Sequence, residues 1–434
     1  MKPKTLLLLV ALAMLPATPA AAAEVYEIHY VPSVGGSVIR VEILRNNNFD
    51  AEKQPVLLTY SPYNSLGGRQ PASDSIAGRF VRRGYARAVA DVLGTRGSTG
   101  CWDYGGAAEQ QSGVDVVKYL ANLPWSNGNV GMIGVSYNGT TANMVAATGI
   151  PELKAIVPIA AISRWYGYAY HDGVRYFLNS REVTDQGFDT PLVFDVGFGD
   201  TVAPDPTGKH FGDTVVARAG ECAAIEHTMH AYSRSPDYTD FWKQRDYRKD
   251  AHKFRAAVLL VHGWQDYNVK QVEGVSLFER IPVDDPSTSE VEGVPFKILH
   301  MTQESHNDAT GPYYAGLLER FLARTLRDQV NGVENEPSVY SLGRDASGAF
   351  RTYDIGASWP PAGTGTLALH LGRSFDTIDG VPSSGPIGTV GETGTLTLGQ
   401  NNDGSGWTHI NTGTISEELT LNDPLNEDGH GFYS

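Results

Sequence analysis

Residues 130–140 read Val130-Gly131-Met132-Ile133-Gly134-Val135-Ser136-Tyr137-Asn138-Gly139-Thr140, and they indicate the fold class more clearly than any other segment. An apolar run typical of a buried strand leads to a serine between two glycines, in the manner of G-x-S-x-G with the second glycine at Gly139. An apolar helical pattern follows over residues 140–147. Such glycines let a strand turn sharply into a helix, which pushes the serine hydroxyl out above the sheet. The sequence therefore predicts Ser136 as a nucleophile, with the following helix N-terminus stabilising negative charge beside it.

A serine nucleophile needs a base that takes its proton and an acid that orients the base. In α/β-hydrolases these partners follow the serine in the order acid, then histidine, on loops after later strands. Asp266 stands just past a buried-strand pattern at residues 256–262, and His306 stands in the loop after the next one, residues 296–300. The order Ser136, Asp266, His306 therefore predicts a catalytic triad.

Other histidines compete for these roles. His300 ends a strand pattern and is the second candidate for the base. His227 and His230 lie three residues apart beside Glu226, a spacing that suits a metal ion, but no third ligand accompanies them. A helix in solvent explains this pair better, and we expect neither a metal nor an organic cofactor.

A serine hydrolase also needs hydrogen-bond donors for the oxyanion of its intermediate. The backbone N–H of Tyr137 is expected as the first donor, because it follows the nucleophile. The second donor usually follows an early buried strand, and Tyr63 stands just after the strand pattern of residues 55–60. Its hydroxyl is the candidate; the alternative is an ordinary loop aromatic. Asp91, near Arg96, is predicted to form a structural ion pair.

Strand patterns alternate with helical ones on both sides of Ser136, which is typical of βαβ units around a largely parallel sheet. This alternation stops between about residues 164 and 255, and after residue 335 the chain becomes rich in glycine and threonine. The fold class is therefore α/β. The expected parts are a signal peptide (1–23), an α/β-hydrolase domain in two pieces (24–163 and 255–335), a helical cap between them (164–254) and an all-β, jelly-roll-like C-terminal domain (336–434).

The composition narrows the function classes. The chain has 434 residues, of which 41% are hydrophobic, enough for a sizeable core. Lys and Arg total 34 against 49 Asp and Glu, giving a formal net charge of −15. Because phosphate neutralisation needs clustered cations, an acidic chain without a basic run is predicted not to bind nucleic acid. The sequence gives no sign of the oligomeric state.

Residues 1–23 have the features of a secretory signal peptide. Lys2 and Lys4 precede an apolar run at residues 6–15, and a segment rich in proline and alanine ends at Ala23. A run of about ten residues is too short for a membrane-spanning helix, which needs about 20 apolar residues. We therefore expect a secreted, extracellular protein without a membrane span.

The two cysteines, Cys101 and Cys222, exclude a disulfide-rich scaffold and a zinc site built from cysteines. In an oxidising compartment a bridge between them can persist and would stabilise the fold by about 4–5 kcal/mol in the chain-entropy model. Two separate thiols are the alternative. A bridge is favoured, because a free thiol is a liability outside the cell.

The sequence around these residues resembles X-prolyl dipeptidyl-peptidases. The resemblance is carried by residues 134–140, 146–149, 160–168, 237–242, 245–247 and 261–269. The wider group of cocaine-esterase-like and α-amino-acid ester hydrolases shares the turn at Ser136, the Pro62-Tyr63 pair and residues 96–100. Two local forms, Gln265-Asp266-x-Asn268-Val269 and Trp165-Tyr166-x-Tyr168, favour the peptidase branch.

This resemblance implies a serine peptidase that releases N-terminal X-Pro dipeptides, with the triad and the Tyr63 donor already described. It also implies that Tyr168 and Asn268 line the dipeptide pocket, with Trp165, in the same aromatic stretch, as a further substrate-binding candidate. The C-terminal domain, at residues 336–434, is shorter than is usual in the family.

Release of a dipeptide requires a carboxylate that holds the free α-ammonium of the substrate. The family carries a glutamate shortly after the aromatic stretch, so Glu182 is the first candidate, with Asp185 and Asp189 as alternatives. Residues 174–182 depart here from the glycine-rich sequence of the family.

Three functions are weighed. The leading hypothesis is a secreted exopeptidase that acts through an acyl-enzyme on peptides with a free N-terminus and proline at the second position. The alternative is a cocaine-esterase-like carboxylesterase, or an amide or acyl-amino-acid ester hydrolase, with the same triad. The third is a binding module without catalysis, which would not need an intact Ser–Asp–His set.

Overall fold

The structure is a computed structural model, and it describes the greater part of the chain. The described residues are 24–64, 71, 75–171, 174–175, 222, 237–284, 287, 293–310, 312–344, 350–356 and 358–359, with six short strands further on. The expected signal peptide, most of the expected cap and most of the C-terminal domain lie outside these residues.

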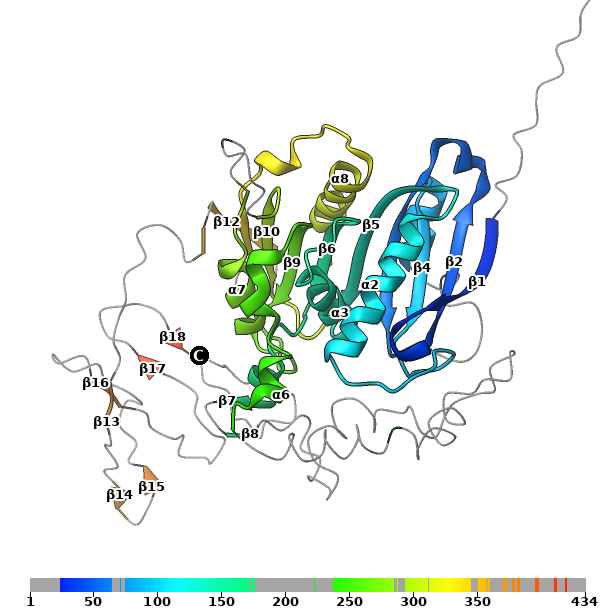
Figure 1. The fold of residues 1–434 in the computed structure, drawn as a ribbon. Helices are drawn as coiled ribbons and strands as arrows, with labels where there is room; N and C mark the ends of the chain where they lie inside the picture. Colours follow the sequence, from blue (N-terminus) through cyan, green and yellow to red (C-terminus); the bar gives the residue numbers. More distant parts are fainter. Residues whose placement is uncertain are drawn as a thin grey trace, which may run out of the picture.

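A ten-stranded mixed sheet forms the centre of the described fold (Figure 1). Its order is β1-β2-β4-β3-β5-β6-β9-β10-β11-β12, parallel from β4 to β11 and antiparallel at both sides. The strands are β1 (Glu24–Pro32), β2 (Val38–Asn46), β3 (Gln54–Ser61), β4 (Ala86–Asp91), β5 (Ser126–Val135), β6 (Leu153–Ile159), β9 (Ala257–Gly263), β10 (Lys297–Thr302), β11 (Val339–Arg344) and β12 (Phe350–Gly356). Because β5, β6, β9 and β10 are parallel neighbours, the loops after them meet at one edge of the sheet.

Helices pack on both faces of this sheet. Alternate side chains of β9 show the division, since Val258 and Leu260 join one core and Leu259 and Val261 the other. The first core also takes side chains from α2 (Ala107–Ala121), α3 (Tyr137–Ala146) and α7 (Gln271–Arg280), and the second from α8 (Pro312–Arg327) and the end of α1 (Ser75–Phe80). The strand residues are apolar on both sides, as a sheet covered on two faces requires.

The helix expected over residues 140–147 is present as α3, and the helical patterns of the sequence near residues 114–123, 272–280 and 313–326 correspond to α2, α7 and α8. Helix α2 begins seven residues earlier than expected. The Asp103 carboxylate accepts the backbone N–H groups of Ala108 at 2.9 Å and Glu109 at 3.0 Å, and so caps the first turn. The first turn is stabilised by this cap and not by an apolar repeat, so the hydrophobic pattern of the sequence did not mark the start of the helix.

The main sheet continues beyond residue 335, where the α/β-hydrolase domain was expected to end. Strand β11 pairs in parallel with β10, and β12 pairs with β11. The expected boundary is therefore wrong by about twenty residues on this sheet. It was placed where the composition changes, whereas Val339 and Tyr340 are buried in the two cores of the sheet.

The C-terminal part is described only as short paired strands. They are β13 (His370–Gly372), β14 (Thr377–Ile378), β15 (Val381–Pro382), β16 (Thr395–Thr397), β17 (Ile410–Asn411) and β18 (Glu418–Leu419). They pair as β13 with β16, β14 with β15 and β17 with β18. An all-β C-terminal domain stays a prediction.

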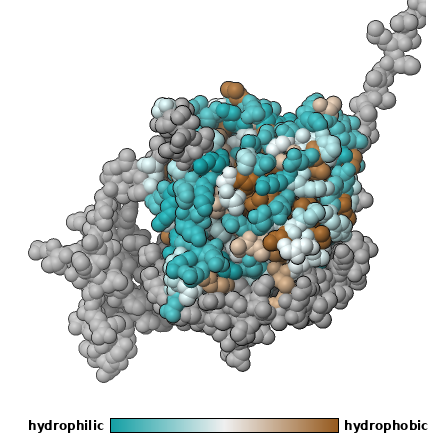
Figure 2. Space-filling model, in the orientation of Figure 1, coloured by the Kyte–Doolittle hydropathy of each residue, from teal (hydrophilic) through white to brown (hydrophobic). Residues whose placement is uncertain are grey.

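Polar side chains cover most of the described surface in the view of Figure 2, and apolar ones appear mainly over the half that carries the N-terminal strands. Ile28 and Tyr30, alternate residues of the edge strand β1, are 38% and 40% exposed. Among the described residues, no helix combines the length and the apolar character that crossing a membrane requires.

Candidate active site

Ser136 occupies a strained turn between β5 and α3. Its backbone has φ 62° and ψ −127°, a region that residues with a side chain rarely adopt. A Cβ on Gly134 would lie 2.4 Å from Cβ of Asn138, and one on Gly139 would lie 2.7 Å from the carbonyl oxygen of Gly134. Both positions therefore require glycine, because a side chain would clash inside the turn. The second glycine, Gly139, stands three residues after Ser136, one more than in the usual G-x-S-x-G pattern.

Asp266 and His306 are in contact with each other, at the edge of the sheet where this turn also lies. Nδ1 of His306 lies 2.9 Å from Oδ2 and 3.0 Å from Oδ1 of Asp266. Asp266 is fully buried, and His306 follows the neighbouring strand β10. One imidazole nitrogen is thus fixed by a carboxylate, which is the arrangement that orients a general base.

The loops that carry these two residues are joined to each other. Trp264 donates its backbone N–H to the carbonyl of Thr302 at 2.8 Å, and Gln265 donates to that of Glu304 at 3.3 Å. A Cβ on Gly263 would lie 2.0 Å from the Glu304 carbonyl oxygen. The loops after β9 and β10 are therefore tied together by their backbones, which favours a constant separation of the carboxylate and the imidazole.

The charge of Asp266 is strongly favoured in this environment. Burial alone would raise its pKa, but hydrogen bonds with His262 and His306 outweigh burial and lower the pKa to about 2. Asp266 is therefore a carboxylate at neutral pH. His262 is a contact of the candidate acid that the sequence analysis missed.

The other imidazole nitrogen of His306, Nε2, is buried and has no hydrogen-bond partner among the described residues. The Ser136 hydroxyl is instead hydrogen-bonded to the Tyr63 hydroxyl. The structure thus brings Asp266 to His306 and Ser136 to Tyr63, and the described contacts do not include a hydrogen bond from Ser136 to His306. Hydrogen bonds of this kind are often long in free enzymes and shorten when substrate binds.

Tyr63 lies where a second oxyanion donor is expected. Its hydroxyl is hydrogen-bonded to the Ser136 hydroxyl and to the backbone N–H of Tyr137, and its ring contacts the Tyr137 ring edge-on at 6.2 Å. Tyr63 is 39% exposed as a residue, but its hydroxyl lies between these two groups. Burial raises the pKa of Tyr63 to about 12, with the two hydrogen bonds partly offsetting it, so the hydroxyl keeps its proton at neutral pH.

A buried ionic cluster anchors the loop that carries Tyr63. Asn64 donates from Nδ2 to Oδ1 of Asp91 at 2.7 Å. Asp91 in turn lies 3.4 Å from Nη1 of Arg96 and 3.6 Å from Nη1 of Arg40, and all three charged residues are almost fully buried. The predicted ion pair of Asp91 with Arg96 is present, and it supports the position of Tyr63 through Asn64.

The residues expected in the substrate pocket have different surroundings. Tyr168 donates its hydroxyl to Oδ1 of Asn268 at 2.7 Å, and the Asn268 backbone N–H donates to Asp266 at 2.9 Å. These two candidates therefore lie together beside the acid. Trp165 is only 3% exposed, with its ring 5.3 Å from that of Tyr137, so it packs under the turn. Glu182 lies outside the described residues, as do Asp185 and Asp189.

Glu109 lies beneath the turn, and the sequence analysis missed it. Its carboxyl group accepts hydrogen bonds from the Tyr137 hydroxyl at 2.8 Å, from Nε1 of Trp102 at 2.9 Å and from the Gly105 backbone N–H at 2.7 Å. Burial and the nearby Asp103 raise its pKa to about 8. A glutamate in the first turn of a helix usually faces solvent, so no local signal indicates this role.

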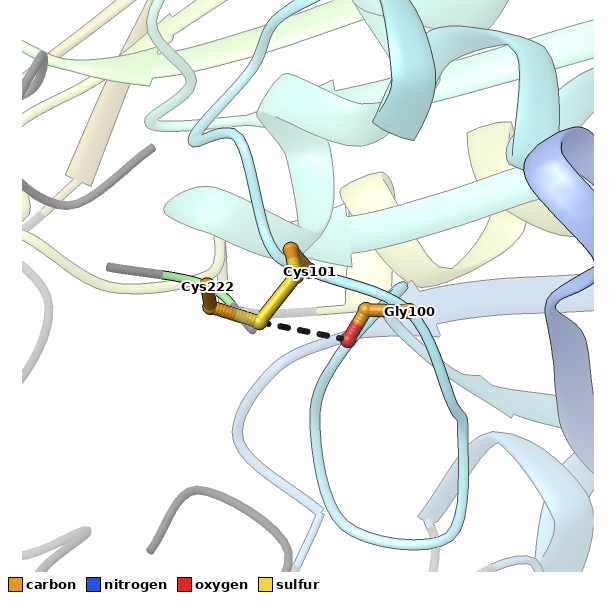
Figure 3. The surroundings of a disulfide bond; sticks show 3 residues. All are labelled: Gly100, Cys101 and Cys222. Carbon is orange, nitrogen blue, oxygen red and sulfur yellow. Dashed lines mark hydrogen bonds between the residues drawn. A yellow bond between two sulfur atoms is a disulfide. The ribbon is translucent and has the colours of Figure 1, made fainter. Parts of the chain in front are cut away.

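The two cysteines form a disulfide between distant parts of the chain (Figure 3). Cys101 and Cys222 are separated by 121 residues, and their Cα atoms are 5.5 Å apart. The bridge joins the segment that follows β4 to the inserted region. It is the pairing that the sequence favoured over two separate thiols.

His300, the second candidate for the base, is fully buried in β10 and away from Asp266. Its ring lies parallel to that of Tyr313 at 6.2 Å and 5.4 Å from that of Tyr314. Neither of its ring nitrogens has a hydrogen-bond partner among the described residues. Burial lowers the pKa of His300 to about 4. A general base works best when its pKa is close to the working pH, so His300 is poorly suited to this role at neutral pH.

His300 is expected to weaken the fold in mild acid. The unfolded chain takes up a proton on this histidine below its ordinary pKa of 6.5, whereas the folded chain does so only near pH 4. Stability from this group is complete above pH 6.5 and falls as the pH is lowered from there, by about 2 kcal/mol between pH 7.5 and 5. The measurement is the free energy of unfolding in urea at both values for the wild type and His300→Phe.

The variant should lose less stability than the wild type on acidification, since phenylalanine fits among the tyrosines without titrating. Replacing the exposed His252 by glutamine controls for the number of histidines. An equal acid sensitivity in the wild type and His300→Phe would contradict the assignment.

Among the described residues, no group of three or more His, Cys, Asp or Glu side chains is arranged to hold a metal ion.

Residues 35–308 match the family model described as X-Pro dipeptidyl-peptidase (S15 family). That match includes Ser136, Asp266 and His306.

Two relatives illustrate the similarity of sequence. A Streptomyces avermitilis protein provisionally named an Xaa-Pro dipeptidyl-peptidase is 32% identical over 427 residues, which covers 89% of this chain and 56% of that protein. The Xaa-Pro dipeptidyl-peptidase of Lacticaseibacillus casei is 30% identical over 314 residues, or 68% of this chain and 37% of that one. The chain spans about half the length of the first curated relatives that it matches.

Solved structures share the fold at low sequence identity. A CocE/NonD family hydrolase from Staphylococcus aureus is 20% identical with a TM-score of 0.58, over 80% of this chain and 61% of that one. An aminopeptidase from a marine sediment archaeon is 19% identical with a TM-score of 0.53, over 81% and 62%. The α/β-hydrolase architecture of the described sheet and helices is therefore shared with known enzymes.

Proposed function

Because the chain belongs to the X-Pro dipeptidyl-peptidase (S15) family, we propose that it is a serine exopeptidase that releases X-Pro dipeptides from peptide N-termini. One observation carries the proposal. Nδ1 of His306 lies 2.9 Å from the Asp266 carboxylate, at the edge of the sheet where Ser136 stands in its strained turn. A histidine oriented by a carboxylate at the same edge as a strained serine supports the roles of base and nucleophile.

In the proposed reaction the Ser136 hydroxyl attacks the carbonyl carbon of the prolyl residue. His306 takes the hydroxyl proton on Nε2 and gives it to the leaving amine, so the dipeptide remains as an ester on Ser136. Water then attacks this ester with the same proton route, which releases the dipeptide and restores the serine. Asp266 stays ionised throughout and fixes the imidazole.

The oxyanion of both intermediates would accept hydrogen bonds from the Tyr137 backbone N–H and the Tyr63 hydroxyl. The Tyr63 hydroxyl is hydrogen-bonded to the Ser136 hydroxyl and to the Tyr137 backbone N–H, which supports this assignment. The reaction requires no metal ion and no organic cofactor.

We place the dipeptide against Tyr168 and Asn268, beside the acid. The hydrogen bond between their side chains gives this wall a fixed shape. A carboxylate from the inserted region, with Glu182 as the first candidate, would hold the free ammonium group. This contact would make the enzyme an exopeptidase, because a blocked amine could not bind it.

The deciding experiment compares three substrates: an Ala-Pro chromogenic anilide, its N-acetylated counterpart and a p-nitrophenyl ester. Cleavage of the free-amine anilide alone is the expected result. Ester hydrolysis without anilide cleavage would instead assign the protein to the esterase branch. Failure of all three, together with no labelling of Ser136 by a fluorophosphonate, would indicate a binding module.

We further propose that the protein is exported, with residues 1–23 removed. The two lysines, the apolar run and the segment of small residues that ends at Ala23 support export. The disulfide in the folded chain supports it as well. Sequencing of the N-terminus of protein recovered from the culture medium tests this, and an intact Met1 on protein kept inside the cell would refute it.

Tyr63→Phe is expected to lower kcat about 10²–10³-fold and to leave KM nearly unchanged, because it removes one oxyanion donor and little substrate contact. Steady-state kinetics on the Ala-Pro anilide measures this. Tyr30→Phe, which removes a hydroxyl from an exposed tyrosine on β1, is the matched control. A kcat of Tyr63→Phe equal to that of the control would remove Tyr63 from the oxyanion hole.

A further inference from the structure

His262 is a buried histidine to which the reaction above gives no role. It lies near the end of β9, four residues before Asp266, and is 0% exposed. Its Nε2 lies 2.8 Å from the carbonyl oxygen of Val269 and 3.3 Å from Oδ2 of Asp266. Because a carbonyl oxygen only accepts hydrogen bonds, Nε2 carries the hydrogen. That N–H is directed between the carbonyl and the carboxylate.

The two oxygens of Asp266 are held in different ways. Oδ1 accepts the backbone N–H groups of Asn268 and Val269, both at 2.9 Å. Oδ2 lies 2.9 Å from Nδ1 of His306, which is also 3.0 Å from Oδ1, and it has His262 at 3.3 Å. In the described part of the chain, His262 is the one side chain other than His306 that contacts Oδ2. His262 therefore opposes rotation of the Asp266 carboxylate about its Cβ–Cγ bond.

The rest of the His262 ring has no polar function among the described residues. Nδ1 is buried without a hydrogen-bond partner, and a Cβ on Gly274 of α7 would lie 2.9 Å from it. An unsatisfied buried nitrogen destabilises the folded state, so packing alone would favour an apolar side chain here. The N–H on the opposite side of the ring is what distinguishes histidine from leucine at this position.

We propose that His262 is a positioning residue of the triad, whose Nε2–H holds Oδ2 of Asp266 in the orientation that accepts the hydrogen bond from His306. It contacts neither the substrate nor the reacting atoms. The inference rests on the proposed function for the roles of Ser136, Asp266 and His306. It goes further by assigning a fourth residue that acts on catalysis through the acid.

The test compares three replacements of His262. Glutamine places its amide N–H near the position of Nε2, asparagine places its amide near Nδ1, and leucine has no donor. The readouts are the rate at which a fluorophosphonate labels Ser136, kcat and KM for the Ala-Pro anilide, and the melting temperature. Labelling needs an activated serine but no X-Pro sequence, so it measures the triad independently of substrate.

His262→Leu and His262→Asn are expected to slow labelling and kcat about 10–100-fold with KM unchanged, since each loses a hydrogen bond to a charged group. His262→Gln is expected to recover the rates to within a few-fold. Near-wild-type rates in His262→Leu would overturn the proposal. So would equal losses in the Gln and Asn variants that follow their melting temperatures, since His262 would then act only in folding.

A double-mutant cycle with Asp266→Ala is a second, independent test of whether His262 acts through Asp266. If His262 acts through Asp266, His262→Leu slows labelling in the wild type and has no further effect once Asp266 is alanine. Losses that simply add in the double variant would overturn the proposal.

Failure of the proposed function is distinguishable from failure of this inference. A wild-type protein that is labelled but does not cleave the anilide refutes the X-Pro specificity, and the His262 variants are then judged on labelling. A wild-type protein that is not labelled refutes both.

Discussion

Replacing Ser136 by alanine is expected to lower turnover of the Ala-Pro anilide by about 10⁶-fold and to abolish labelling by a fluorophosphonate. The loss is large because in the proposed mechanism the serine oxygen forms the acyl bond itself, while the rest of the site remains. Alanine keeps the Cβ and therefore the same strain at φ 62°, so the melting temperature should stay close to that of the wild type.

Ser136→Gly separates the strain from the chemistry. Glycine adopts a positive φ without steric cost, so this variant should be inactive and also more stable to unfolding, by about 1 kcal/mol. Ser276→Ala, on α7, is the control and should keep full activity. If Ser136→Ala retained near-wild-type turnover, a different nucleophile would have to be found.

Replacing Asp266 by asparagine is the second change with a large expected effect, about 10⁴-fold in kcat. The amide oxygen can still accept the backbone N–H groups of Asn268 and Val269, so the side chain should keep its place. Its NH₂ group then faces His306 and forces Nδ1 to accept. The hydrogen moves to Nε2, where the base needs a lone pair for the serine proton.

Kinetics and pH dependence together test this account. Asp266→Asn should be slow over the whole pH range, because the wrong tautomer persists when the imidazole is neutral. Asp284→Asn, an acid on the loop after α7, should behave as the wild type. Full activity of Asp266→Asn at any pH would exclude Asp266 as the orienting acid.

The sequence was sufficient for the parts of the site that depend on local signals. Ser136 was recognisable because the turn needs glycines at Gly134 and Gly139, and the contacts of both explain that need. Asp266 and His306 were recognisable because each follows a continuous apolar run that forms a strand. Their 2.9 Å contact then follows from the adjacent positions of β9 and β10.

The residues that were missed depend on contacts between distant parts of the chain. His262 lies inside an apolar strand pattern, and its N–H finds acceptors in Asp266 and Val269 only because the following loop folds back over it. Glu109 is buried by Tyr137 and Trp102, which lie on other segments. Trp165 was expected at the pocket and packs under the turn, since an aromatic pattern does not reveal which face of a short helix is covered.

The disulfide changes the result of proteolytic cleavage of the chain. Cys101 and Cys222 close a covalent ring that contains Ser136 but neither Asp266 nor His306. A single peptide-bond cut anywhere between the two cysteines opens the ring without separating the chain into two molecules. A nicked protein would run as one species on a denaturing gel without reductant and as two with it, and Ser136 would stay attached to the segment that carries Asp266 and His306.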